Sequence, residues 1–208
     1  MQLYGALISP FVHKVALAAS EKGVSYDLVR LSPHAPDPGF AEASPFRKIP
    51  AIRDGDFTLA DSSAIVAWLE RRHPAPALFP HDAEGYGRAV WFDEFADTIL
   101  GGAGLKVLFH RLVGPKLLKV GGDEAIALQG EAELAPITAW FEDAAPDSGW
   151  LLGADFGIAD IAVASLFRSL GYVGHAPDPA RHPRTAAWYE RVCARPAWQA
   201  VADQESRL

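Results

Sequence analysis

Hydrophobic and polar positions change their spacing about one third of the way along the chain. Residues 1 to about 75 mix short alternating runs with helical ones, whereas from about residue 82 the apolar positions recur at helical spacing almost throughout. The join near residues 73–85 carries three prolines within seven positions, which is typical of a linker. The pattern predicts a small α/β domain at 1–76, a linker at 77–84 and an all-helical domain at 85–208.

The first region predicts a small mixed sheet with helices packed on it. A Ser-Pro pair is a strong helix start, and Asp54-Gly55 suits the type I′ turn of a hairpin. The expected elements are strands at 2–8 and 25–31, a helix from Ser9-Pro10 to Gly23, a hairpin of 49–53 and 56–59, and a helix from Asp61-Ser62 to about Arg72. Their order is β-α-β, loop, β-β-α, with the proline-rich segment SPHAPDP as the loop.

The second region predicts helices only. They are expected at roughly 83–100, 103–113, 123–145, 157–171, 183–195 and 197–203. Gly101-Gly102 and Gly114-Pro115 are expected to end the first two, because glycine and proline interrupt helices. The fold class is therefore an α/β domain followed by an all-α domain.

Composition excludes several classes of function. The 208 residues carry a net charge of −7, which argues against a nucleic-acid binder because such proteins need a basic surface. A single cysteine, Cys193, excludes a disulfide framework, a CxxC redox pair and a cysteine zinc site, and favours a cytoplasmic location. The seven histidines contain no pair three or four apart, so no metal is expected.

The Ser9-Pro10 start of the first helix is a candidate site for a thiol. Amide groups and the positive end of the helix dipole favour an anion there. Lowering a thiol pKa by about two units takes roughly 2.7 kcal/mol, within reach of one hydroxyl hydrogen bond plus the dipole. No cysteine lies at this place, so the thiol must come from a ligand. The alternative is that Ser9 serves only as a helix cap.

Two further segments suit a peptide ligand. A cis peptide before Pro50 would turn the backbone of Ile49 toward an extended peptide, and Lys48 adds a cation for a carboxylate. Asp61 and Ser62, at a helix N-terminus, suit the ammonium and carboxylate of an amino-acid head. Each has a plain alternative, a proline at a strand edge in the first case and a capping motif in the second.

Together the three segments describe a site for glutathione. The runs LYGALISPFVHKVALAASEKGVSYDLV, ASPFRKIPAI and LADSSAIVAWL resemble cytosolic glutathione transferases, especially the serine-type classes such as tau. The later run LLGADFGIADIAVASLF is similar to the helical-domain signature of that family. The resemblance implies a thioredoxin-like domain followed by a helical domain, a homodimer, and conjugation of glutathione to apolar electrophiles without a metal.

The resemblance also implies roles for single residues. Ser9 would bind the glutathione thiolate and act as the catalytic residue. Lys48 would bind the glycyl carboxylate, Ile49 would pair its backbone with the cysteinyl unit, and Pro50 would be the family's cis-proline. Asp61 and Ser62 would grip the γ-glutamyl head.

The pocket for the electrophile is expected between the domains. Helical spacing places three of its candidate residues on one face, and that spacing equally describes ordinary core or a dimer contact. The expected lining residues are Phe11, Trp91, Phe95 and Ile99. Their aromatic character suits apolar substrates.

The chain departs from the family pattern at several positions. Asp61 stands where many members have Glu, and Arg47 where many have Gly. Gly157 replaces the Ser or Thr that completes a capping box with Asp160. His13, one turn beyond Ser9, is expected on the surface of the first helix, and the alternative is a contact with the site.

Other functions stay open at this stage. One is a non-catalytic member of the same fold, and another is a glutathione-dependent isomerase or dehalogenase. Ser9 stands where glutaredoxins and the cysteine-type transferases have their reactive cysteine, which argues against disulfide exchange. Tyr4 is expected in the core, and Cys193 is expected to be a buried small side chain and no nucleophile.

Overall fold

The computed structural model describes residues 1–31 and 37–206, which form two compact units. The first unit is Met1–Phe79 together with the segment from Ala194 on, and the second is Pro80–Cys193. The predicted boundaries followed chain order, whereas the last helix packs with the first unit. Trp198 from that helix lies against the ring of His13, with 4.8 Å between ring centroids. Part of the predicted loop, 32–36, lies outside the described residues.

The first unit has the predicted element order with one additional helix. Its elements are β1 (Gln2–Tyr4), α1 (Pro10–Glu21), β2 (Asp27–Val29), α2 (Pro38–Ala43), β3 (Ala51–Asp54), β4 (Phe57–Ala60), α3 (Ser62–Arg72) and α9 (Pro196–Ser206). The described residues form a four-stranded sheet of order β2-β1-β3-β4, in which β1 and β2 are parallel and the other neighbours antiparallel. The predicted mixed sheet with packed helices is confirmed.

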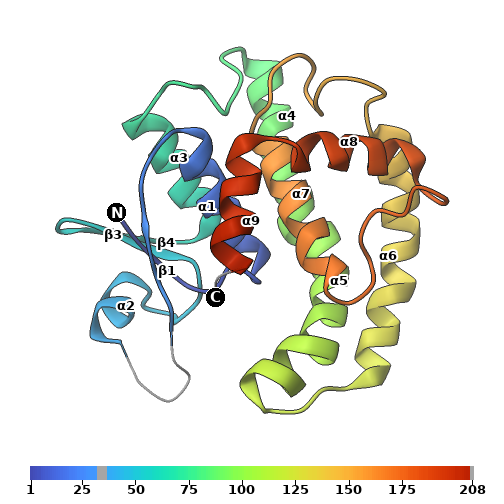
Figure 1. Ribbon diagram of the computed structural model, residues 1–208, viewed down its shortest axis with the longest axis horizontal. Helices are drawn as coiled ribbons and strands as arrows, with labels where there is room; N and C mark the ends of the chain where they lie inside the picture. The colour runs from blue at the N-terminus through green and yellow to red at the C-terminus, as the bar shows by residue number, and fades with distance from the viewer. Residues whose placement is uncertain (32–36, 207–208) are drawn as a thin grey trace. The chain divides into compact units, whose positions relative to one another are not determined.

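Helices cover both faces of this sheet (Figure 1). Tyr4 and Ala51 pair in register and form a core cluster with Ala43 and Phe40 of α2. Leu3 and the opposite Ile52 point to the other face, because side chains alternate along a strand. That face carries α1 and α3. The expected core position of Tyr4, which is 3% exposed, is confirmed.

The hairpin turn lies one residue later than predicted. Asp54 pairs with Phe57, so the two central residues are Gly55 and Asp56 and not Asp54 and Gly55. Gly55, in the first central position, has a φ of 61°. A type I′ turn needs positive φ at both central residues, whereas glycine in the first position is typical of type II′. The strands pair in this register because Gly55 adopts the positive φ that the first central position of the turn requires.

The second unit is built from helices, as predicted. Its elements are α4 (Ala83–Glu94), the π-helical segment η1 (Phe95–Leu100), α5 (Gly101–Leu108), a second π-helical segment η2 (Phe109–Leu118), α6 (Glu124–Ala144), α7 (Ile158–Gly171) and α8 (Pro183–Cys193). The predicted breaks at Gly101-Gly102 and at Gly114-Pro115 were both wrong, because the chain stays helical at each. A Cβ on Gly101 would lie 2.8 Å from the carbonyl oxygen of Ala96. Glycine therefore allows a close backbone approach within a continuous helix.

Helix α7 forms the centre of the second unit. Twelve of its 14 residues are buried, and it packs against α4 and α5. Gly157 caps it without a side-chain bond, and the retained half of the capping box is the Gly157 N–H donating to Asp160. Asp160 also accepts from the N–H of Leu151 at 3.0 Å and from Nε1 of Trp188 at 2.7 Å. One buried carboxylate thus joins α7, α8 and the preceding loop.

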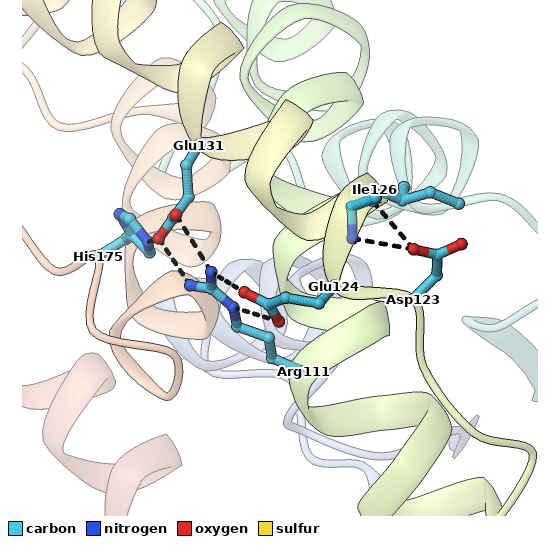
Figure 2. Close-up of polar contacts among 7 residues, drawn as sticks. Arg111, Asp123, Glu124, Ile126, Glu131 and His175 are labelled. Carbon is cyan, nitrogen blue, oxygen red and sulfur yellow. Dashed lines mark hydrogen bonds and ion pairs between the residues drawn. The ribbon is translucent and has the colours of Figure 1, made fainter.

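Charged side chains fasten η2 and the loop after α7 onto α6 (Figure 2). Arg111 donates to Glu124 and to Glu131, each at 2.6 Å, and His175 lies 2.8 Å from the same Glu131. The Arg111 guanidinium holds the pKa of Glu131 below its ordinary value. Within the described chain, no helix combines the length and apolar character needed to cross a membrane.

Candidate functional site

Ser9 stands at the N-terminus of α1, and residues 5–8 separate it from the end of β1 at Tyr4. It has extended backbone angles, φ −71° and ψ 126°, and its side chain makes no capping hydrogen bond. Pro10 occupies the first helical position and has no N–H. The first amides of a helix lack partners within it, and in α1 these include the amides of Phe11 and the buried Val12, close in sequence to the half-buried Ser9. The hydroxyl and these amides together can stabilise an anion.

The Lys48–Pro50 loop leads into β3. The Ile49–Pro50 peptide is cis, as predicted. Lys48 is exposed, Ile49 half-buried and Pro50 buried. Arg47, before them, has a φ of 54°, a conformation that glycine adopts without cost. This conformation explains why a glycine is common at the position in the family that the sequence resembles.

Asp61 and Ser62 begin α3. Asp61 is exposed and accepts from the N–H of Ala64 at 3.0 Å, so its carboxylate caps the helix while one face stays open to solvent. Its φ of 83° with ψ of 129° is uncommon for a residue with a side chain and lies outside the left-handed helical region. Ser62 is buried beside it, with 3% of its surface exposed. The capping role and a ligand role are therefore compatible for Asp61.

The β3–β4 hairpin brings the second and third segments together. Pro50 precedes β3 and Asp61 follows β4, and the N–H of Asp61 donates to the carbonyl of Pro50 at 3.3 Å. The first segment approaches through Gly5, where a Cβ would lie 3.4 Å from Cβ of Ile49 and would clash with Val12. All six predicted glutathione-binding residues lie in the first unit.

Three positioning residues escaped the sequence reasoning. Gly5 permits the close approach just described, and Lys14 donates from Nζ to the Ser63 hydroxyl at 3.1 Å, which ties α1 to the first turn of α3. Ser44 holds the loop before β3 through hydrogen bonds to the backbone of Lys48. The sequence carries no signal that predicts the burial of Lys14. It does carry one for Ser44, because a serine before a proline is typical of a turn.

His13 corrects a sequence prediction. The residue was expected on the helix surface, but it is fully buried, with 0% exposure. The physical reason is α9, which returns to the first unit and places Trp198 edge-on against the imidazole. Sequence periodicity within α1 cannot reveal a cover that comes from the other end of the chain.

The predicted pocket residues of the second unit meet in one cavity. Trp91, Phe95 and Ile99 line an apolar cavity of about 290 Å³. It is completed by Pro136, Ile137 and Trp140 of α6. Phe11, the fourth predicted residue, belongs to α1 in the first unit.

Cys193 is chemically quiet. Burial raises the pKa of its thiol to about 11, so almost no thiolate is present at neutral pH. Among the described residues, no group of histidine, cysteine and carboxylate side chains is arranged to hold a metal ion.

Comparison with known proteins gives the same assignment for both parts of the chain. Residues 3–77 match the family model of the glutathione S-transferase N-terminal domain, and residues 123–191 match that of the C-terminal domain. Glutathione S-transferase 3 of Zea mays is 31% identical in an alignment that covers 96% of this chain and 91% of the maize protein.

Solved structures agree in fold over nearly the full length. Glutathione S-transferase III in its apo form has a TM-score of 0.81 at 30% identity, covering 97% of this chain and 95% of the other. Glutathione S-transferase I bound with lactoylglutathione has a TM-score of 0.84 at 25% identity, covering 97% and 98%. With sequence, fold and both domain models in agreement, the chain belongs to the glutathione S-transferase family.

Proposed function

We propose that this glutathione S-transferase activates the glutathione thiol with Ser9. The observation that carries the proposal is that the Ser9 hydroxyl makes no capping bond to its own helix. A serine kept only as a cap would accept from the second or third amide of α1. Here the hydroxyl stays available to donate to a thiolate, and the amides of Phe11 and Val12 add positive partial charge.

The peptide part of glutathione binds along the segments next to Ser9. Ile49 pairs its backbone with the cysteinyl unit, and Lys48 attracts the glycyl carboxylate. Asp61 takes the ammonium group of the γ-glutamyl head, and Ser62 with the first amides of α3 takes its carboxylate. The contact between the Asp61 N–H and the Pro50 carbonyl supports this arrangement, because it places both ends of the peptide site on one hairpin.

The reaction is a nucleophilic substitution or addition. The thiol proton leaves to solvent, the thiolate attacks an electrophilic carbon, and a carbon–sulfur bond forms. In a substitution on an aryl halide, the bond to the halide breaks and the halide leaves with its electron pair. The protein lowers the thiol pKa and orients the two reactants.

Ser9→Ala tests the role of the hydroxyl. Removing a hydrogen bond to a charged group costs about 1.5–3 kcal/mol, so the pKa of the bound thiol should rise by about one to two units. The measurement is the ultraviolet absorbance of the bound thiolate against pH, with Ser9→Thr as the control that keeps the hydroxyl. The turnover number at neutral pH should fall by about tenfold to a hundredfold. An unchanged pKa and an unchanged turnover number would remove Ser9 from the mechanism.

The apolar cavity lined by Trp91, Phe95 and Ile99 is the proposed wall of the electrophile site. Its lining is aromatic and aliphatic, which suits substrates that are themselves apolar. Trp91 and Ile99 are nearly half exposed, at 46% and 47%. Such exposure also suits contact with a second chain, which is the alternative for this face.

Two further parts of the proposal concern assembly and location. We propose a homodimer, which the family resemblance implies and which exposed aromatic side chains support. They include Phe46, Phe57, Trp91 and Trp140, with 43% to 87% of their surfaces exposed. The cytoplasmic location rests on the single cysteine and stays a prediction.

A further inference from the structure

The loop between α2 and β3 is organised around one buried serine. Ser44 is 1% exposed and follows the last residue of α2, where its N–H donates to the Phe40 carbonyl at 2.8 Å. Its own carbonyl accepts from the N–H of Arg47 at 2.9 Å. The serine therefore joins the end of the helix to the turn that precedes the glutathione segment.

The Ser44 hydroxyl holds both backbone groups of Lys48. It donates to the Lys48 carbonyl at 2.7 Å and accepts from the Lys48 N–H at 2.9 Å. A hydroxyl has one donor and two acceptor positions, so a single side chain can satisfy both groups. No aliphatic side chain can replace it.

These two hydrogen bonds to Lys48 fix the direction of the N–H of Ile49. The Lys48–Ile49 peptide is trans, and in a trans peptide the carbonyl and the N–H point in opposite directions. Because the Lys48 carbonyl is drawn toward the buried Ser44, the N–H of Ile49 points away from it. Lys48 itself is exposed, so its ammonium remains in solvent while its backbone is fixed.

We infer that Ser44 is a positioning residue for glutathione, because its buried hydroxyl turns the Lys48–Ile49 peptide so that the Ile49 N–H meets the ligand backbone. The inference rests on the proposed function of this loop and adds a residue that itself touches no ligand. Ser44 acts on binding of the peptide backbone, whereas Ser9 acts on ionisation of the thiol. The two roles are separable in kinetics.

Ser44→Ala removes both bonds and Ser44→Thr keeps the hydroxyl. The probes are glutathione, by calorimetry, and 1-chloro-2,4-dinitrobenzene as the electrophile in steady-state assays. We expect Ser44→Ala to raise the Kd and the KM for glutathione about tenfold. The kcat and the KM for the electrophile should stay within about twofold, and Ser44→Thr should restore glutathione binding to within about threefold of the wild type.

A matched control separates positioning from a loss of stability. Ser165 on α7 is as deeply buried, with 0% exposure, and lies in the other unit. Ser165→Ala should leave the KM for glutathione unchanged, even where it lowers the melting temperature. Should Ser44→Ala fail to fold, Ser44→Cys keeps the size with a weaker hydrogen-bonding group and should raise the KM for glutathione by an intermediate factor.

The outcomes are distinguishable. Normal glutathione binding by Ser44→Ala, or an equal rise in the KM values for both substrates, overturns the role of Ser44 and leaves the proposed function intact. A wild-type protein that does not bind glutathione overturns the proposed function, and the role of Ser44 with it.

Discussion

Ser9 and Asp61 begin their helices in the same position but use their side chains differently. Asp61 accepts from the third residue of its helix, whereas the Ser9 hydroxyl takes no part in capping. Asp61 combines capping with an exposed carboxylate, and Ser9 leaves the first amides of α1 without a side-chain partner.

Asp160 is a structural carboxylate whose effect on stability depends on pH. Burial raises its pKa to about 6 from 3.8, against the hydrogen bonds from Leu151, Trp188 and Gly157, which lower it. Between these pH values the folded protein holds a proton that the unfolded chain releases, so stability falls as pH rises through this window.

The pH dependence that Asp160 adds to the free energy of unfolding can be measured by comparison with Asp160→Asn, whose side chain does not titrate at this position. The wild type's free energy of unfolding relative to the variant should be highest below pH 4 and should fall by about 3 kcal/mol by pH 7. Urea unfolding of both proteins at several pH values measures it. A relative stability that rises with pH would show that the three donors, and not burial, dominate the pKa of Asp160.

At the scale of elements, the sequence predicted most helices and strands but missed what distant contacts decide. The hairpin was found from Asp54-Gly55, yet its register depends on which central residue takes a positive φ. Helix α2 follows a proline-rich stretch, and its packing against Tyr4 has no periodic signal. At the site, residue types marked Ser9, Pro50 and Asp61, whereas Ser44 and Lys14 act through contacts that only folding creates.

Gly101 and Gly102 give a matched test of the continuous helix. A Cβ at Gly101 would press on the Ala96 carbonyl oxygen, so Gly101→Ala should destabilise the protein by about 1–3 kcal/mol. A Cβ at Gly102 meets nothing within 4 Å, so Gly102→Ala should stabilise it by about 0.5–1 kcal/mol. Thermal unfolding followed by circular dichroism gives both values. Two changes of the same sign would mean that the helix is not continuous at this point.

At the scale of the whole molecule, the two units carry different parts of the chemistry. The first holds all the proposed glutathione contacts, and its last helix comes from the far end of the chain. The second holds the apolar cavity of Trp91, Phe95 and Ile99. If these proposed roles hold, activity requires both units.

Sedimentation tests the assembly and the cavity together. At micromolar concentration we expect twice the chain mass of 22.4 kDa for the wild type. Trp91→Ala should remain a dimer and raise the KM for an apolar electrophile several-fold, with an unchanged KM for glutathione. A variant that dissociates to monomers with an unchanged KM for the electrophile would assign the cavity to the subunit contact. A monomeric wild type would contradict the dimer.

The most direct test of the account is calorimetry of glutathione binding to the wild type and to Asp61→Asn. Asparagine keeps an oxygen for the Ala64 N–H and has the same size as aspartate, so the variant removes the charge and leaves the helix cap. We predict binding in the micromolar to low-millimolar range for the wild type and about tenfold to hundredfold weaker binding for the variant, at equal melting temperatures. Equal affinity of the two proteins, or no binding by the wild type, would contradict the site.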